Sequence, residues 1–223
     1  MLGFALCLPI PAPAELQFSK IQGELVGVPP PEIPVRAANV VSQADTNDKE
    51  SATTNVLLAV VEMNPCTVPS TVAQIARTSP TMASLAAATA VSLQPNQVFL
   101  ITKASVGAVP TQITAVVSAI INQIPSQYIG VAESASQVYP SAGTNILNGV
   151  IQSIPVLRPY IDTLVAKNPP GADLPVAAIL NQSTMMALHH LSAPKSPATS
   201  SSEQMHSGQD ESANPAASSG PTH

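Results

Sequence analysis

The middle of the chain repeats a pattern of apolar and polar positions every fifteen residues, and a proline begins each repeat. Apolar side chains recur three, six, ten and fourteen places after the proline, and these offsets lie on one face of a helix rather than alternating as in a strand. The pattern therefore predicts one short helix per repeat. The prolines are Pro65, Pro80, Pro95, Pro110, Pro125, Pro140, Pro155 and Pro170, and the column six places later reads Thr71, Ala86, Ile101, Val116, Val131, Ile146, Ile161 and Val176.

Proline suits the first turn of a helix, where its missing N–H has no partner to lose. The residue after it is often a capping type, as in Thr81, Asn96 and Ser126, so in an alternative interpretation the helix begins one residue later with this side chain as its N-cap. In either case the next proline ends the preceding helix, and short connections make successive helices antiparallel neighbours. The sequence predicts an all-α fold in which these helices stack as an α-solenoid or a helical bundle.

The same reasoning divides the chain. Residues 50–192 form the predicted helical-repeat domain, which ends with a longer closing helix from Leu174 to Leu191. Residues 193–223 are rich in Ser, Pro and Ala without apolar periodicity, and their composition predicts a disordered tail. Residues 15–49 form a Pro-rich leader, in which residues 29–34 are expected to be extended and residues 36–44 to form one helix.

The first fourteen residues resemble an export signal. An apolar run leads to Ala12-Pro13-Ala14, a small-x-small cleavage pattern, and cleavage after Ala14 would make Glu15 the new terminus. No Lys or Arg stands before Lys20, so two alternatives remain open: the true start lies upstream, or this is a short apolar N-terminus of no consequence. The predicted location is outside the cytoplasm: periplasm, cell envelope or secreted.

Charge is scarce. Charged residues make up 9% of the chain, the net charge is −5 and Lys plus Arg number 8. Because nucleic-acid binding requires clustered basic residues, this composition argues against a nucleic-acid partner. It also predicts no transmembrane span, since prolines and amides interrupt the longest uncharged stretch, residues 104–132.

One segment carries a family resemblance. The text ATTNVLLAVVEMNPCTV, Ala52 to Val68, is followed by proline-led units and resembles exported, Ala-rich bacterial proteins with short helical repeats and no known function. The resemblance covers about residues 50–170 and implies an all-α fold and export. It provides no catalytic residue to transfer. This chain has fewer charges on its exposed positions than such proteins.

The motifs of the common catalytic classes are absent from the sequence, and no histidine precedes His189. If the signal is removed, Cys66 is the one cysteine that remains, and we expect it to be a small buried hydrophobe. The sharpest candidate site comprises Met185, Met186, His189 and His190. Each Met stands four residues before a His, so each pair shares a helix face, and thioether with imidazole suits copper. In the simpler interpretation one Met packs in the core and the histidines cover the helix end.

These observations predict a non-enzymatic protein without a cofactor. The first hypothesis is an exported binding scaffold whose exposed Gln, Asn, Ser and Thr side chains meet an unknown protein or glycan partner. The second is an envelope-associated or self-assembling structural protein, because a surface with little net charge favours self-association.

Overall fold

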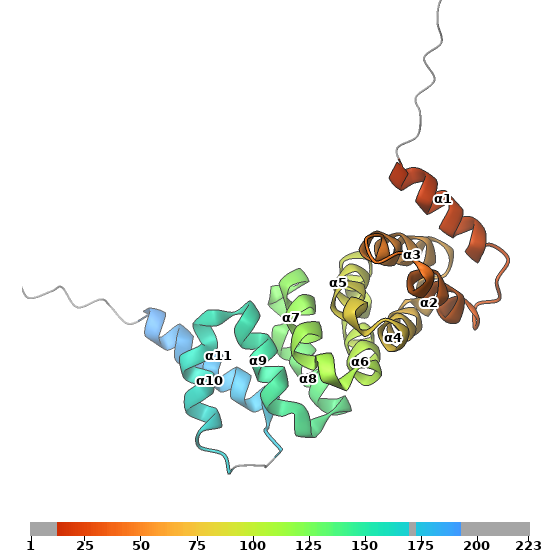
Figure 1. Cartoon of the computed structure of the whole chain (residues 1–223). Coiled ribbons are helices and arrows are strands. Elements are labelled where there is room, and N and C mark those ends of the chain that lie inside the picture. Colours follow the sequence, from red (N-terminus) through yellow and green to blue (C-terminus); the bar gives the residue numbers. More distant parts are fainter. Residues whose placement is uncertain (1–12, 170–172, 193–223) are drawn as a thin grey trace, which may run out of the picture. The chain divides into compact units, whose positions relative to one another are not determined.

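The computed structural model describes residues 13–169 and 173–192, and these described residues belong to one compact unit. The predicted disordered tail, residues 193–223, and residues 1–12 of the predicted signal lie outside the described residues. Within them the chain forms eleven α-helices and seven short 3-10 helices (Figure 1). The helices are α1 (Pro13–Leu25), α2 (Ile33–Gln43), α3 (Lys49–Met63), α4 (Val68–Thr78), α5 (Ala83–Leu93), α6 (Val98–Ala108), α7 (Ile113–Gln123), α8 (Tyr128–Val138), α9 (Gly143–Ser153), α10 (Arg158–Val165) and α11 (Val176–Ser192).

Each central repeat is a 3-10 turn of three residues, an α-helix of eleven and one connecting residue, which together make the fifteen-residue period. The turns are η1 (Pro65–Thr67), η2 (Pro80–Met82), η3 (Pro95–Gln97), η4 (Pro110–Gln112), η5 (Pro125–Gln127), η6 (Pro140–Ala142) and η7 (Pro155–Leu157). The prediction of one short helix per proline-led repeat is thus confirmed.

The connecting residue joins two helices through its backbone. Ser79 is an example: its N–H donates to the Ile75 carbonyl at 2.8 Å, and its own carbonyl accepts from the Met82 N–H at 2.9 Å. Both polar groups are therefore satisfied at a sharp change of direction. Pro80, which lacks an N–H, stands where no donor is needed.

The alternative helix start was wrong. The proline itself begins the helical segment, and the residue after it, such as Thr81 or Asn96, lies inside the 3-10 turn and is exposed. No side-chain cap bond is formed at the starts of α5 or α6. In place of a capping side chain, the carbonyl of the connecting residue accepts a 3-10 hydrogen bond from a backbone N–H at the start of the helical segment.

Helices α1 to α9 form two layers, because each of them packs most extensively on a helix next but one along the chain. The odd layer is α1, α3, α5, α7 and α9, and the even layer is α2, α4, α6 and α8 (Figure 1). Extensive contacts among the described helices join only elements close in chain order, so the array is an open stack of the α-solenoid type.

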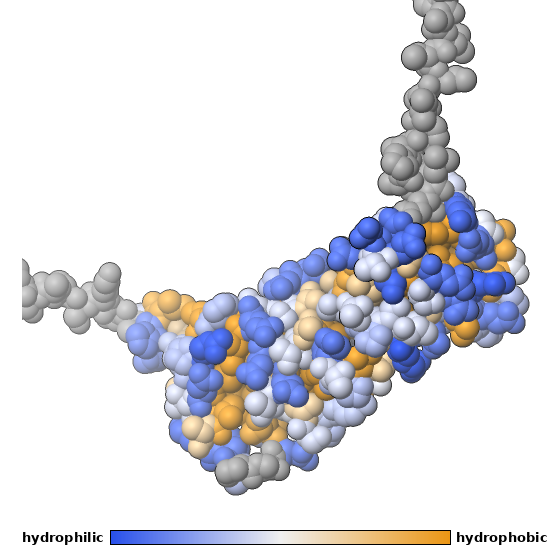
Figure 2. Space-filling view, in the orientation of Figure 1, coloured by the Kyte–Doolittle hydropathy of each residue, from blue (hydrophilic) through white to orange (hydrophobic). Residues whose placement is uncertain are grey.

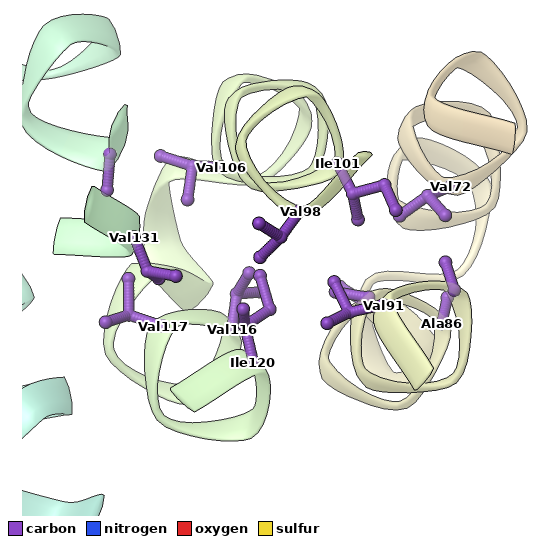
Figure 3. Close-up of a cluster of buried hydrophobic side chains, with 14 of the residues drawn as sticks. Val72, Ala86, Val91, Val98, Ile101, Val106, Val116, Val117, Ile120 and Val131 are labelled. Carbon is purple, nitrogen blue, oxygen red and sulfur yellow. The ribbon is translucent and has the colours of Figure 1, made fainter. Parts of the chain in front are cut away.

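The core lies between the layers. Numbering each repeat from its proline, positions 4, 7, 11 and 15 are the predicted apolar columns. Val98, Ile101, Val116 and Ile120 show the first three buried, and the fourth is buried at Val109 but only half-buried at Ile124. Figure 3 shows Val98 of α6 pointing toward Val116 and Ile120 of α7. Positions 8 and 12 are buried as well; these residues include Val72, Val91, Val106, Val117 and Ile121. These two columns, absent from the sequence prediction, face the adjacent helix within a layer.

The ordered stack reaches further toward the N-terminus than the expected boundary at residue 50. Helix α1 packs on α3, and α2 packs on α4. The expectation of an extended segment at residues 29–34 was wrong in part, since the Glu32 N–H donates to the Pro29 carbonyl in a turn and Pro34 lies in the first turn of α2. Here Pro34 again occupies a helix start, which is compatible with its fixed φ.

The end of the array departs from the repeat. Helix α10 is short, with eight residues, and the longer α11 lies beside α8 in its place. The Tyr128 hydroxyl of α8 bonds the Thr184 hydroxyl of α11. Because Thr184 donates its proton to the Leu180 carbonyl at 2.7 Å, Tyr128 must be the donor in this pair.

Among the described residues, no single helix is long and apolar enough to cross a membrane. The segments Pro95–Ala108 and Pro110–Gln123 reach that length and composition only as a pair, and they meet at a bend of 115°.

Candidate binding surface

Helices α5, α7 and α9 carry no charged residue. Their exposed side chains are hydroxyls and amides: Ser92, Asn122, Gln123, Thr144, Asn145, Asn148 and Gln152. We call this set the uncharged face. Ser92, Asn122 and Gln152 hold position 13 of their repeats, so they occur in equivalent places on three consecutive helices of one layer.

The neighbouring layer has a different surface. Arg77 of α4, Lys103 of α6 and Glu133 of α8 are all exposed. Helix α6 adds Phe99 and Leu100, which are 42% and 60% exposed. From α4 to α9 the charged residues thus lie only in the even layer, whereas the first two helices of the odd layer, α1 and α3, carry charges of their own. Sorting the charged residues of the proline-led repeats into alternate repeats reveals this distribution in the sequence. Only the structure shows that alternate repeats form separate layers.

Hydroxyl groups also hold the uncharged face together. The Thr114 hydroxyl of α7 donates to the Asn145 carbonyl of α9 at 3.0 Å, and the Ser153 hydroxyl donates to the Ser118 carbonyl at 3.0 Å. The hydroxyl oxygens of Ser118 and Ser153 are also 3.0 Å apart. These bonds tie the helix backbones directly to one another, so the face is a pre-organised surface.

The predicted metal ligands all lie on α11. Met185 is 69% exposed and shares its exposed side of the helix with His189. Met186 is half-buried against the core, in keeping with the packing interpretation, while His190 is exposed. Among the described residues no three His, Cys, Asp or Glu side chains gather closely enough to hold a metal ion. The copper site stays a prediction.

The expectation for Cys66 was wrong: its side chain is exposed. The residue occupies position 2, inside turn η1, and position 2 is exposed in every repeat from η1 to η7. The sequence did show this, because Thr, Asn or Ser fill the same column in the next five repeats, from Thr81 to Ser141. The residue types at position 2 of the repeats predict the exposure of Cys66 better than its closeness in sequence to apolar positions does.

The fold makes the chain an α-helical repeat protein with a two-layered stack. No family model matches it, and neither a curated protein nor a solved structure was found to be similar.

Proposed function

We propose that the protein is a non-enzymatic binding scaffold, and that it holds its partner on the uncharged face of α5, α7 and α9. The observation that carries this proposal is the absence of charged residues from three consecutive helices of the odd layer. In a chain with so few charged residues, keeping three adjacent helices free of them leaves a surface that recognises through hydrogen bonds.

The chemistry of the face indicates the kind of partner. Amide side chains such as Asn122 and Gln152 both donate and accept hydrogen bonds, and hydroxyls do the same. Such groups suit a polar partner without strong charge, either a protein segment or a glycan. Recognition of this kind depends little on salt, because no ion pairs are screened.

The face offers little for catalysis. Its side chains are neutral at ordinary pH and provide neither a general base nor an activated nucleophile. The titratable groups of this part of the array, Lys103 and Glu133 among them, belong to the even layer. This distribution supports a role in binding over one in chemistry.

Site-specific photo-crosslinking in the native cells tests the proposal. A photoreactive residue replaces Asn122 of α7 in one variant and Gln137 of α8 in another; both positions are exposed and both are position 13 of a repeat. We expect an adduct from residue 122 that survives raised salt, and none from residue 137. Equal labelling at the two positions, or adducts at residue 137 alone, would overturn the proposal.

A further inference from the structure

Large exposed apolar side chains concentrate at the two ends of the stack. Val26 and Val35 belong to the first two helical segments, and they are 65% and 50% exposed. Val156, Met185, Leu188 and Leu191 belong to the last elements, whereas the middle exposes Phe99 and Leu100. On the side shown in Figure 2, strongly apolar residues appear over the last helices and over the first. Repeat arrays ordinarily end in polar caps. The exposed apolar side chains of α11 depart from that pattern, while α1 exposes Lys20 and Glu24 as well as small residues.

Within the stack, helices of one layer join by placing a larger side chain against a small residue of the next. Phe99 of α6 lies over Gly130 of α8, where a Cβ would be 2.6 Å from the ring. Gly149 of α9 receives Val117 of α7 in the same way, with a Cβ 3.0 Å from the valine. Large-on-small packing of this kind joins α6 to α8 and α7 to α9.

Helix α1 presents half of such an interface to solvent. Ile21 and Leu25 are buried on the side of α1 that meets α3, and Gln22 donates to Glu62 of α3 at 3.4 Å. The side turned away from them carries Ser19 and Gly23, both exposed, and Val26 follows directly after the last residue of the helix. Lys20 and Glu24 are exposed beside this side. A Cβ on Gly23 would meet nothing within 4 Å, so the place opposite this glycine is open.

Helix α11 presents the other half. Met185, Leu188 and Leu191 recur every third residue along one side and are 69%, 55% and 75% exposed. Burying such side chains is favourable by about 1.5–3 kcal/mol each when it is complete. No charged residue of Asp, Glu, Lys or Arg type interrupts α11 from Val176 to Ser192.

We propose that a second copy of this chain covers these ends, with the Met185–Leu188–Leu191 strip of one copy packing on the Ser19–Gly23–Val26 side of α1 in the next. The contact continues the large-on-small packing that joins helices within the chain. It is heterologous, because the two faces are different and lie on opposite ends of the stack, and such contacts generate open chains or rings of copies. A net charge of −5 on 223 residues gives little long-range repulsion against it.

Sedimentation velocity of the full chain over a wide concentration range is the test. We expect the wild-type protein to form dimers and longer species as concentration rises. Leu188→Lys and Val26→Lys each place a charge in the contact and should weaken association by about tenfold or more. Leu100→Lys is the matched control, since Leu100 is 60% exposed but lies in the middle of the stack, and it should associate like the wild type.

Mixing the two end variants separates a heterologous contact from a symmetric one. Each variant keeps one intact face, so the mixture of Leu188→Lys with Val26→Lys should form a dimer that does not extend. Normal association of Val26→Lys alone would show that α11 pairs with α11 and would overturn the proposal, as would a wild-type chain that stays monomeric. Circular dichroism of each variant establishes that the fold is kept. The crosslinking experiment at Asn122 tests the proposed binding face separately, so its outcome does not depend on whether the chain self-associates.

Discussion

Gly149 of α9 lies so close to Val117 of α7 that a Cβ on the glycine would be 3.0 Å from the valine Cβ and 2.9 Å from the Thr114 carbonyl oxygen. These two helices also share the most extensive contact in the described array. The absent side chain is therefore what sets the spacing of the odd layer at this point, and the hydroxyl bonds of Thr114 and Ser153 depend on that spacing.

Replacing Gly149 by alanine should destabilise the array by about 1–3 kcal/mol, because the new methyl group meets backbone and a Cβ that have no freedom to move aside. Chemical denaturation measures the change. Gly107→Ala is the control: there the new Cβ meets only Val138 Cγ1 at 3.5 Å, an ordinary contact, so higher helix propensity should stabilise by up to about 1 kcal/mol. Equal effects of the two substitutions would contradict this account of the packing.

Ser183 of α11 is fully buried, and its hydroxyl has no hydrogen-bond partner. An unsatisfied buried hydroxyl costs roughly 1–3 kcal/mol, so Ser183→Ala should raise the free energy of unfolding. Ser105 is equally buried but donates to the Ile101 carbonyl at 2.8 Å, so Ser105→Ala should gain less. The difference between the two variants in denaturant unfolding isolates the hydrogen bond, since both make the same change in a helix. A larger gain at Ser105 would refute the assignment.

Tyr128→Phe should loosen the closing helix without disturbing the middle of the stack. The variant removes the hydroxyl that donates to Thr184, which costs about 1 kcal/mol. Hydrogen exchange should become faster in α11, while the amides of α5 keep their protection. Equally faster hydrogen exchange in both helices would mean that the array unfolds as a single unit and that the Tyr128–Thr184 hydrogen bond does not stabilise α11 locally.

Cys66 should react with a thiol reagent in the native protein about as fast as in the unfolded chain, because its side chain is exposed within η1. The measurement uses a Cys7→Ser background, so that one thiol is counted, and Cys66→Ser in that background is the blank. Slow reaction in buffer that accelerates in denaturant would restore the interpretation of Cys66 as a core residue.

The helices and their buried columns followed from the sequence because they depend on local periodicity. Val116 and Ile120 recur at helical spacing after Pro110, and that pattern needs no knowledge of what the helix packs against. Val117 is buried against Gly149 of α9, which lies two repeats further along, so spacing within one helix did not predict its burial.

The end of the array was harder to predict for the same reason. The spacing of prolines continues to Pro155 as if α10 were another member of the stack, yet α11 takes the place beside α8. Tyr128 and Thr184, which meet there, are 56 residues apart in sequence. Likewise the uncharged face can be recognised in the sequence only when it is known that alternate repeats form separate layers.

The connecting residue, exemplified by Ser79, makes the chain modular in length. Because every repeat closes its backbone hydrogen bonds locally and helices pack only on near neighbours, two consecutive repeats such as residues 95–124 form the translational unit of the stack, with one helix in each layer. Duplication or loss of such a pair preserves the alternation of layers, whereas a change of one repeat moves every later helix into the other layer and so divides the uncharged set α5, α7 and α9 between layers. The length of this protein can thus be altered in evolution or by design only in steps of a pair if its surface chemistry is to survive.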